Sequence, residues 1–116
     1  MSTKIYYNPR CSKSRQTLQL LEDNNVQPEI IEYLKTPPSE SELKDILKAL
    51  DMSPRELMRK GEAEYKENNL ADTSLSDEQL ISAMLKYPKL IERPIVVTAD
   101  NKYALGRPPE SVLDIL

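Results

Sequence analysis

Residues 6–15, Tyr-Tyr-Asn-Pro-Arg-Cys-Ser-Lys-Ser-Arg, decide the fold and carry the only cysteine of the chain. Asn8-Pro9 is a turn dipeptide, because proline fixes φ and has no N–H to donate to a strand. The β-favouring residues 4–7 therefore predict a strand that ends at this turn. The apolar spacing that follows predicts a helix over 12–24. Cys11 is thus placed at a helix N-terminus.

This placement favours a reactive thiol over a buried structural one. Free N–H groups and the positive end of the helix dipole stabilise a thiolate, so we predict an accessible Cys11 whose pKa lies below the free value of about 8.5. Arg10, Lys13 and Arg15 add positive charge where a helix start favours negative charge, and we therefore expect an anion to bind here. For each residue taken alone, a small buried hydrophobe or a solvated surface charge remains an alternative.

Composition excludes several classes of protein. A chain of 116 residues suffices for one domain, and its net charge of −3 argues against the broadly basic surface of a nucleic-acid or membrane-surface binder. The absence of histidine removes the Cys-His dyad and the commonest metal ligand, so we expect no metal site. One cysteine allows no internal disulfide, and we see no signal-like segment or long apolar span. We expect a cytoplasmic monomer.

The middle of the chain predicts a block of helices. A strand over 27–34, rich in β-favouring residues, comes first and completes a strand–helix–strand unit. Three serines then each precede Glu or Gln by three residues, which is the capping-box signature of a helix start: Ser39, Ser53 and Ser76. Their apolar stripes are interpreted as core-facing.

The C-terminal part predicts a hairpin and a last helix. Residues 94–98 form a continuous β-branched run, and 102–105 are its partner across a turn. Residues 110–116 are expected to form a short helix that packs through Val112, Leu113 and Leu116. The order βαβ, helical insertion, ββα predicts an α/β protein with a mixed four-stranded, thioredoxin-like sheet. We expect a single domain over 1–116, with the helical insertion at about 39–90.

Four motifs carry a resemblance to a known family over essentially the whole chain. They are Asn8-Pro9-x-Cys11-x-x-Ser14-Arg15, Leu57-Met58-Arg59-Lys60, Glu92-Arg93-Pro94-Ile95-Val96-Val97 and Gly106-Arg107-Pro108. In these motifs the chain closely resembles the glutaredoxin-coupled arsenate reductase family. The best-known members have histidine where this chain has Tyr7, so thiol activation here must rest on helix amides and cations.

The resemblance implies a reaction and the residues that carry it. Cys11 would be the nucleophile that reduces arsenate to arsenite, with glutathione as co-substrate, glutaredoxin as partner and no bound cofactor. The oxyanion ligands would be Arg59, Arg93 and Arg107. The supporting residues would be Asn8, Ser14, Arg15 and Pro94.

This chemistry suits the residues. Arsenate is a tetrahedral anion, and planar guanidinium groups can neutralise and orient its oxygens for attack by a thiolate. Ser14 stands where a C-x-x-C motif would place a second cysteine, so the reducing electrons must come from another molecule.

Two other functions remain open. The first is a glutathione-dependent thiol oxidoreductase without a role in arsenate reduction, which would use the same Cys11. The second is a redox regulator or adaptor that binds RNA polymerase, as a related branch of this fold does. That branch typically uses C-x-x-C, which this chain lacks.

The resemblance also predicts two features of the structure. The Arg93–Pro94 peptide should be cis, because thioredoxin-like folds place a cis proline opposite the active-site cysteine. Arg59, Arg93 and Arg107 should converge around the Cys11 sulfur and bind arsenate, sulfate or phosphate weakly, with an affinity that falls as salt rises.

Overall fold

The computed structural model describes residues 3–116, so Met1 and Ser2, which the domain prediction includes, lie outside the described residues. The chain forms two compact units. One, the sheet unit, consists of the residues up to Thr36 and of Arg93–Leu116, and the other, the helical unit, is Pro37–Glu92. The helical unit has nearly the bounds expected of the insertion, and a single domain over 1–116 stays a prediction.

The sheet unit contains a mixed four-stranded sheet with the strand order β2-β1-β3-β4. β1 (Lys4–Tyr7) pairs in parallel with β2 (Glu29–Glu32) and antiparallel with β3 (Ile95–Val97). β3 pairs antiparallel with β4 (Tyr103–Leu105). The predicted fold class is confirmed.

β2 is shorter than the predicted strand over 27–34. The chain turns directly after Glu32, because its carbonyl accepts hydrogen bonds from the amides of both Lys35 and Thr36 at 2.9 Å. Backbone groups used in this turn cannot extend a sheet ladder.

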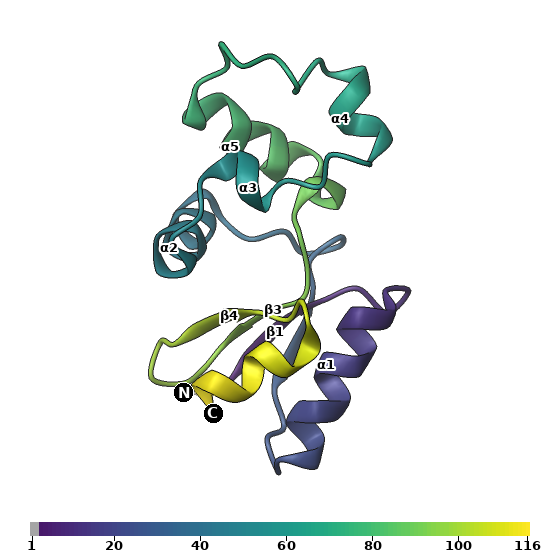
Figure 1. The fold of residues 1–116 in the computed structure, drawn as a ribbon, viewed down its shortest axis with the longest axis vertical. Coiled ribbons are helices and arrows are strands. Elements are labelled where there is room, and N and C mark those ends of the chain that lie inside the picture. Colours follow the sequence, from purple (N-terminus) through teal and green to yellow (C-terminus); the bar gives the residue numbers. More distant parts are fainter. Residues whose placement is uncertain (1–2) are drawn as a thin grey trace. The chain divides into compact units, whose positions relative to one another are not determined.

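Two helical segments share a core with one face of the sheet: α1 (Ser12–Asp23) and the 3₁₀ helix η2 (Pro109–Ile115) (Figure 1). The centre of this core is fully or almost fully buried and is formed by Ile5, Leu21, Val96, Ala104 and Val112. The core therefore joins α1 to three of the four strands.

The predicted packing of the last segment is wrong for Leu113 and Leu116, which are 41% and 48% exposed. A 3₁₀ helix has three residues per turn, so only one row of residues three apart can face the sheet. In η2 that row is Pro109, Val112 and Ile115, of which the first two are buried.

The helical unit contains five segments. They are α2 (Glu40–Leu50), α3 (Pro54–Leu57), α4 (Ala63–Glu67), α5 (Asp77–Lys86) and the 3₁₀ helix η1 (Pro88–Leu90). The predicted capping boxes at Ser39, Ser53 and Ser76 are all present, each with both reciprocal hydrogen bonds. Among residues 3–116, no helix is long and apolar enough to cross a membrane.

The Ser39 capping box gives a prediction for stability. Ser39→Ala removes the hydroxyl that accepts from the Glu42 amide at 3.1 Å, and we expect it to lower the free energy of unfolding by about 1 kcal/mol. Urea denaturation of both proteins measures this difference. Ser41→Ala, two residues further along the exposed start of α2, is the control and should leave the midpoint almost unchanged. Equal effects of the two substitutions would contradict the capping account.

Candidate active site

Cys11 is the N-cap residue of α1, with φ −94° and ψ 123°. Its amide donates to the Asn8 carbonyl at 2.9 Å, and its carbonyl accepts from the Arg15 amide at 3.1 Å. Cys11 is only 7% exposed, so the predicted accessibility is wrong. Cys11 is therefore the last residue of the turn, whose exposed tip is Pro9 and Arg10.

The thiol is nevertheless poised to ionise. Burial is the largest influence and raises the pKa of the Cys11 thiol, but the amide and hydroxyl of Ser14, the Arg93 guanidinium and the Lys13 amide together hold this pKa below its usual value. The neutral thiol makes no capping hydrogen bond to the first turn, so the N–H groups there remain for the thiolate. The predicted direction of the shift is confirmed.

The supporting residues of the first motif hold the turn together. The Ser14 hydroxyl, fully buried, accepts from the Asn8 amide at 3.3 Å, and the Asn8 side-chain oxygen accepts from the Arg10 amide at 3.0 Å. Arg15 Nη1 donates to the Pro9 carbonyl at 2.9 Å. In this structure Arg15 thus binds the turn itself, and the guanidinium that lowers the Cys11 pKa belongs to Arg93.

Arg93 and Arg107 belong to neighbouring loops of the sheet unit. The Arg93–Pro94 peptide is cis, as predicted, and so is Arg107–Pro108, which was not predicted. Arg107 Nη1 donates to the Arg93 carbonyl at 3.2 Å, and the Gly106 amide donates to the Pro94 carbonyl at 2.8 Å. The two loops are therefore bonded to each other, and one of them brings a guanidinium close to Cys11.

Sequence reasoning missed the contact that lies below these loops. Thr17, which lies on α1 six residues after Cys11 and is fully buried, packs so tightly under Gly106 that a Cβ added there would lie 2.6 Å from Thr17 Oγ1. The same Cβ would lie 2.8 Å from Pro94 Cγ. The helix that begins at Cys11 thus supports the loops of both arginines. The sequence signal for this contact was Gly106, one of two glycines in the chain, which directly precedes Arg107.

Arg59 lies in the helical unit, where the structure shows its carboxylate partners. Its Nη1 is 3.3 Å from a Glu62 oxygen and its Nε is 3.7 Å from a Glu92 oxygen, and all three side chains are about a quarter exposed. The Arg59 amide donates to the Leu90 carbonyl at 2.7 Å. The approach of Arg59 to Cys11 stays a prediction.

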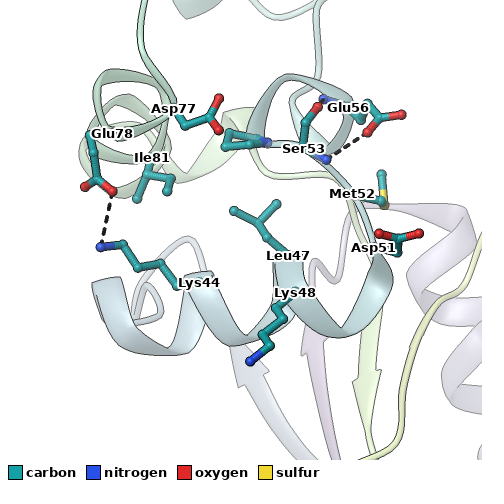
Figure 2. A pocket seen from close by; sticks show the side chains of 11 residues that line it. Lys44, Leu47, Lys48, Asp51, Met52, Ser53, Glu56, Asp77, Glu78 and Ile81 are labelled. Atoms are coloured by element: carbon teal, nitrogen blue, oxygen red, sulfur yellow. Dashed lines mark hydrogen bonds and ion pairs between the residues drawn. The ribbon is translucent and has the colours of Figure 1, made fainter.

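A cavity of about 600 Å³ lies in the helical unit between α2 and the first turns of α3 and α5 (Figure 2). Its Lys44 ammonium group pairs with Glu40 at 3.3 Å and with Glu78 at 3.4 Å. None of the predicted site residues lines it, and we assign it no part in the chemistry. Within residues 3–116, no group of three Cys, Asp or Glu side chains is placed to hold a metal ion.

Comparison with known proteins supports one family. The sequence model described as the ArsC family matches residues 6–115. The chain is 61% identical to the uncharacterized protein YfgD of Escherichia coli (strain K12), over 97% of this chain and 95% of that protein. It is 48% identical to an arsenate reductase of Haemophilus influenzae, over the full length of both. A solved structure named arsenate reductase from Vibrio cholerae superposes with a TM-score of 0.94 at 53% identity, covering 100% of this chain and 98% of that one.

The lowered thiol pKa predicts the pH dependence of Cys11 alkylation. Only the thiolate reacts, so the iodoacetamide rate should rise with pH to a plateau whose midpoint lies below about 8.5, the value of a free thiol. Arg93→Ala removes a positive charge near the sulfur and should move the midpoint upward. Lys102→Gln, which removes a charge at the far end of the β3–β4 hairpin, should not. A midpoint at or above that of a free thiol, or one unmoved by Arg93→Ala, would contradict this environment.

The packing under Gly106 predicts that Gly106→Ala is destabilising. The added methyl group overpacks the contact with Thr17 and Pro94, and we expect a loss of about 1–3 kcal/mol of folding free energy, measured by urea denaturation. Gly61→Ala is the matched control, since an added Cβ there meets nothing within 4 Å. Adding Thr17→Ala to Gly106→Ala removes the closest clash and should recover part of the loss. No recovery would show that the clash is not with Thr17.

Proposed function

Because the chain belongs to the ArsC family, we propose that it is an arsenate reductase in which Cys11 is the nucleophile, glutathione the co-substrate and glutaredoxin the final reductant. The observation that carries the proposal is the thiol of Cys11, which is held ready to ionise by Ser14 and by the Arg93 guanidinium. A thiolate with a guanidinium beside it suits attack on an anion, because the cation offsets the repulsion between two negative charges.

The proposed reaction uses two thiols for each arsenate. Cys11 condenses with arsenate, which forms a sulfur–arsenic(V) bond and releases one water. The glutathione thiol then attacks the Cys11 sulfur, and the sulfur–arsenic electron pair passes to arsenic, so that arsenite leaves and a Cys11–glutathione disulfide remains. Glutaredoxin reduces this disulfide and restores the Cys11 thiolate. In sum, arsenate and two thiols give arsenite, one disulfide and one water.

The arginines are proposed to bind the arsenate oxygens. Arg107 is exposed and Arg93 half-buried, and both come from loops that are bonded to each other. Guanidinium groups can each give two parallel hydrogen bonds to a tetrahedral oxyanion. Arg59 would complete the set, as the family resemblance implies.

One observation favours a second candidate, the glutathione-dependent thiol oxidoreductase without a role in arsenate reduction. Arg59 already has two carboxylate partners, Glu62 and Glu92, which is the arrangement of an ordinary ion pair and not of a ligand site awaiting an anion. This candidate would use Cys11 to reduce mixed disulfides of glutathione and would need none of the three arginines for arsenate.

Arsenate turnover with glutathione and glutaredoxin separates the two candidates. We expect Cys11→Ser to abolish turnover, and Arg93→Ala or Arg107→Ala to lower it by about 100-fold, as removal of an oxyanion donor does, while thermal midpoints change little. Lys89→Ala, an exposed cation of η1, is the control and should retain full turnover. If wild type reduces no arsenate but reduces a glutathione mixed disulfide through Cys11, the second candidate takes the place of the first.

A further inference from the structure

The proposed chemistry leaves Arg10 without a role. Arg15 binds the Pro9 carbonyl and Arg93 acts on the sulfur, whereas the Arg10 side chain has no hydrogen bond or ion pair with any residue in 3–116. Arg10 is exposed and immediately precedes Cys11. A guanidinium in this position is available to an external anion.

Arg10 lines a cavity of about 280 Å³ in the sheet unit, beside the turn that carries Cys11. One wall is the end of β1 and the turn itself, and the other is the segment at and after the end of β2. The lining residues are Tyr7, Asn8, Pro9, Arg10, Glu32, Leu34 and Lys35. We call this cavity the turn groove. Its volume is just below the range that is typical of small-molecule sites, about 300–1,000 Å³.

The turn groove offers three kinds of contact. Arg10 and Lys35 supply two cations, while Glu32 supplies one carboxylate, 3.6 Å from the Lys35 ammonium. Leu34, which is 37% exposed, supplies apolar surface, and Tyr7 also lines the groove. Such a lining suits a ligand with a carboxylate, an ammonium group and a short apolar stretch. It suits a bare tetrahedral oxyanion poorly, because Glu32 would repel it.

The groove and the nucleophile are parts of one bonded turn. Asn8 lines the groove, accepts from the Cys11 amide at 2.9 Å and bonds through its own amide to the Ser14 hydroxyl at 3.3 Å. Arg10 directly precedes Cys11, and consecutive Cα atoms are about 3.8 Å apart. An extended peptide of three residues spans about 10 Å. Cys11 itself does not line the groove, so a small peptide thiol seated there must extend past Arg10 for its sulfur to reach Cys11.

We propose that the turn groove binds the anionic peptide thiol that reduces Cys11. Its carboxylate meets Arg10 and Lys35, its ammonium group meets Glu32, and its sulfur faces Cys11. This inference rests on the proposed function only in requiring an external thiol, which the absence of a second cysteine demands of either candidate. Glutathione belongs to this chemical class.

The test uses no arsenate. Cys11 is first converted to its 2-pyridyl disulfide; a thiolate then attacks the Cys11 sulfur and expels pyridine-2-thione, which is followed by absorbance. We expect wild type to react faster with glutathione than with 2-mercaptoethanol, after correction for thiol pKa. Arg10→Gln and Lys35→Gln should each lower the glutathione rate constant by about three- to tenfold and leave the 2-mercaptoethanol rate constant unchanged.

The controls separate binding in the groove from a general change in charge. Lys102→Gln removes the same charge away from the groove and should alter neither rate constant. Glutathione with its glycine carboxylate esterified should react with wild type as slowly as glutathione reacts with Arg10→Gln. The proposal would be overturned if Arg10→Gln and Lys35→Gln lowered the rate constants of glutathione and 2-mercaptoethanol equally. It would also be overturned if they lowered neither rate constant. Arsenate reduction could still stand after that result, and a chain that reduces no arsenate could still show this preference.

Discussion

The structure depends on one constraint: its single thiol is almost completely buried and yet must carry negative charge. Burial by itself would keep Cys11 protonated, because a desolvated thiolate is unfavourable. The turn before α1 and the start of that helix offset this with the amides of Ser14 and Lys13 and the Ser14 hydroxyl, and Arg93 adds a charge from a distant segment. The fold can be understood as the means of bringing these groups to one sulfur.

Two connections bring them together. The first is local: Asn8 and Ser14 tie the turn to the first turn of α1, so the sulfur and its amides form one unit. The second is long-range: Thr17 on α1 packs under Gly106, which is hydrogen-bonded to Pro94, beside Arg93. Because helix, turn and loops are in contact, a shift in any of them would change the charge that the sulfur experiences.

Local patterns explain what could be predicted from the sequence. The strand before Asn8-Pro9, the boxes at Ser39, Ser53 and Ser76, and the hairpin after Pro94 each depend on residues close in the chain, and the cis Arg93–Pro94 bond followed from the family resemblance. The burial of Cys11 and the contact between Thr17 and Gly106 could not be predicted, because both arise from tertiary packing between distant segments. The oxyanion roles of Arg59, Arg93 and Arg107 stay predictions.

The central claim is that one thiolate forms a bond to arsenic and is then released by an external thiol. A single turnover with arsenate and one equivalent of glutathione, stopped by acid and followed by intact-protein mass measurement, tests it most directly. The account predicts that a glutathione disulfide accumulates on Cys11 only when arsenate is present and that arsenite appears in equal amount. Arsenite without this disulfide, or the same disulfide in the absence of arsenate, would contradict it.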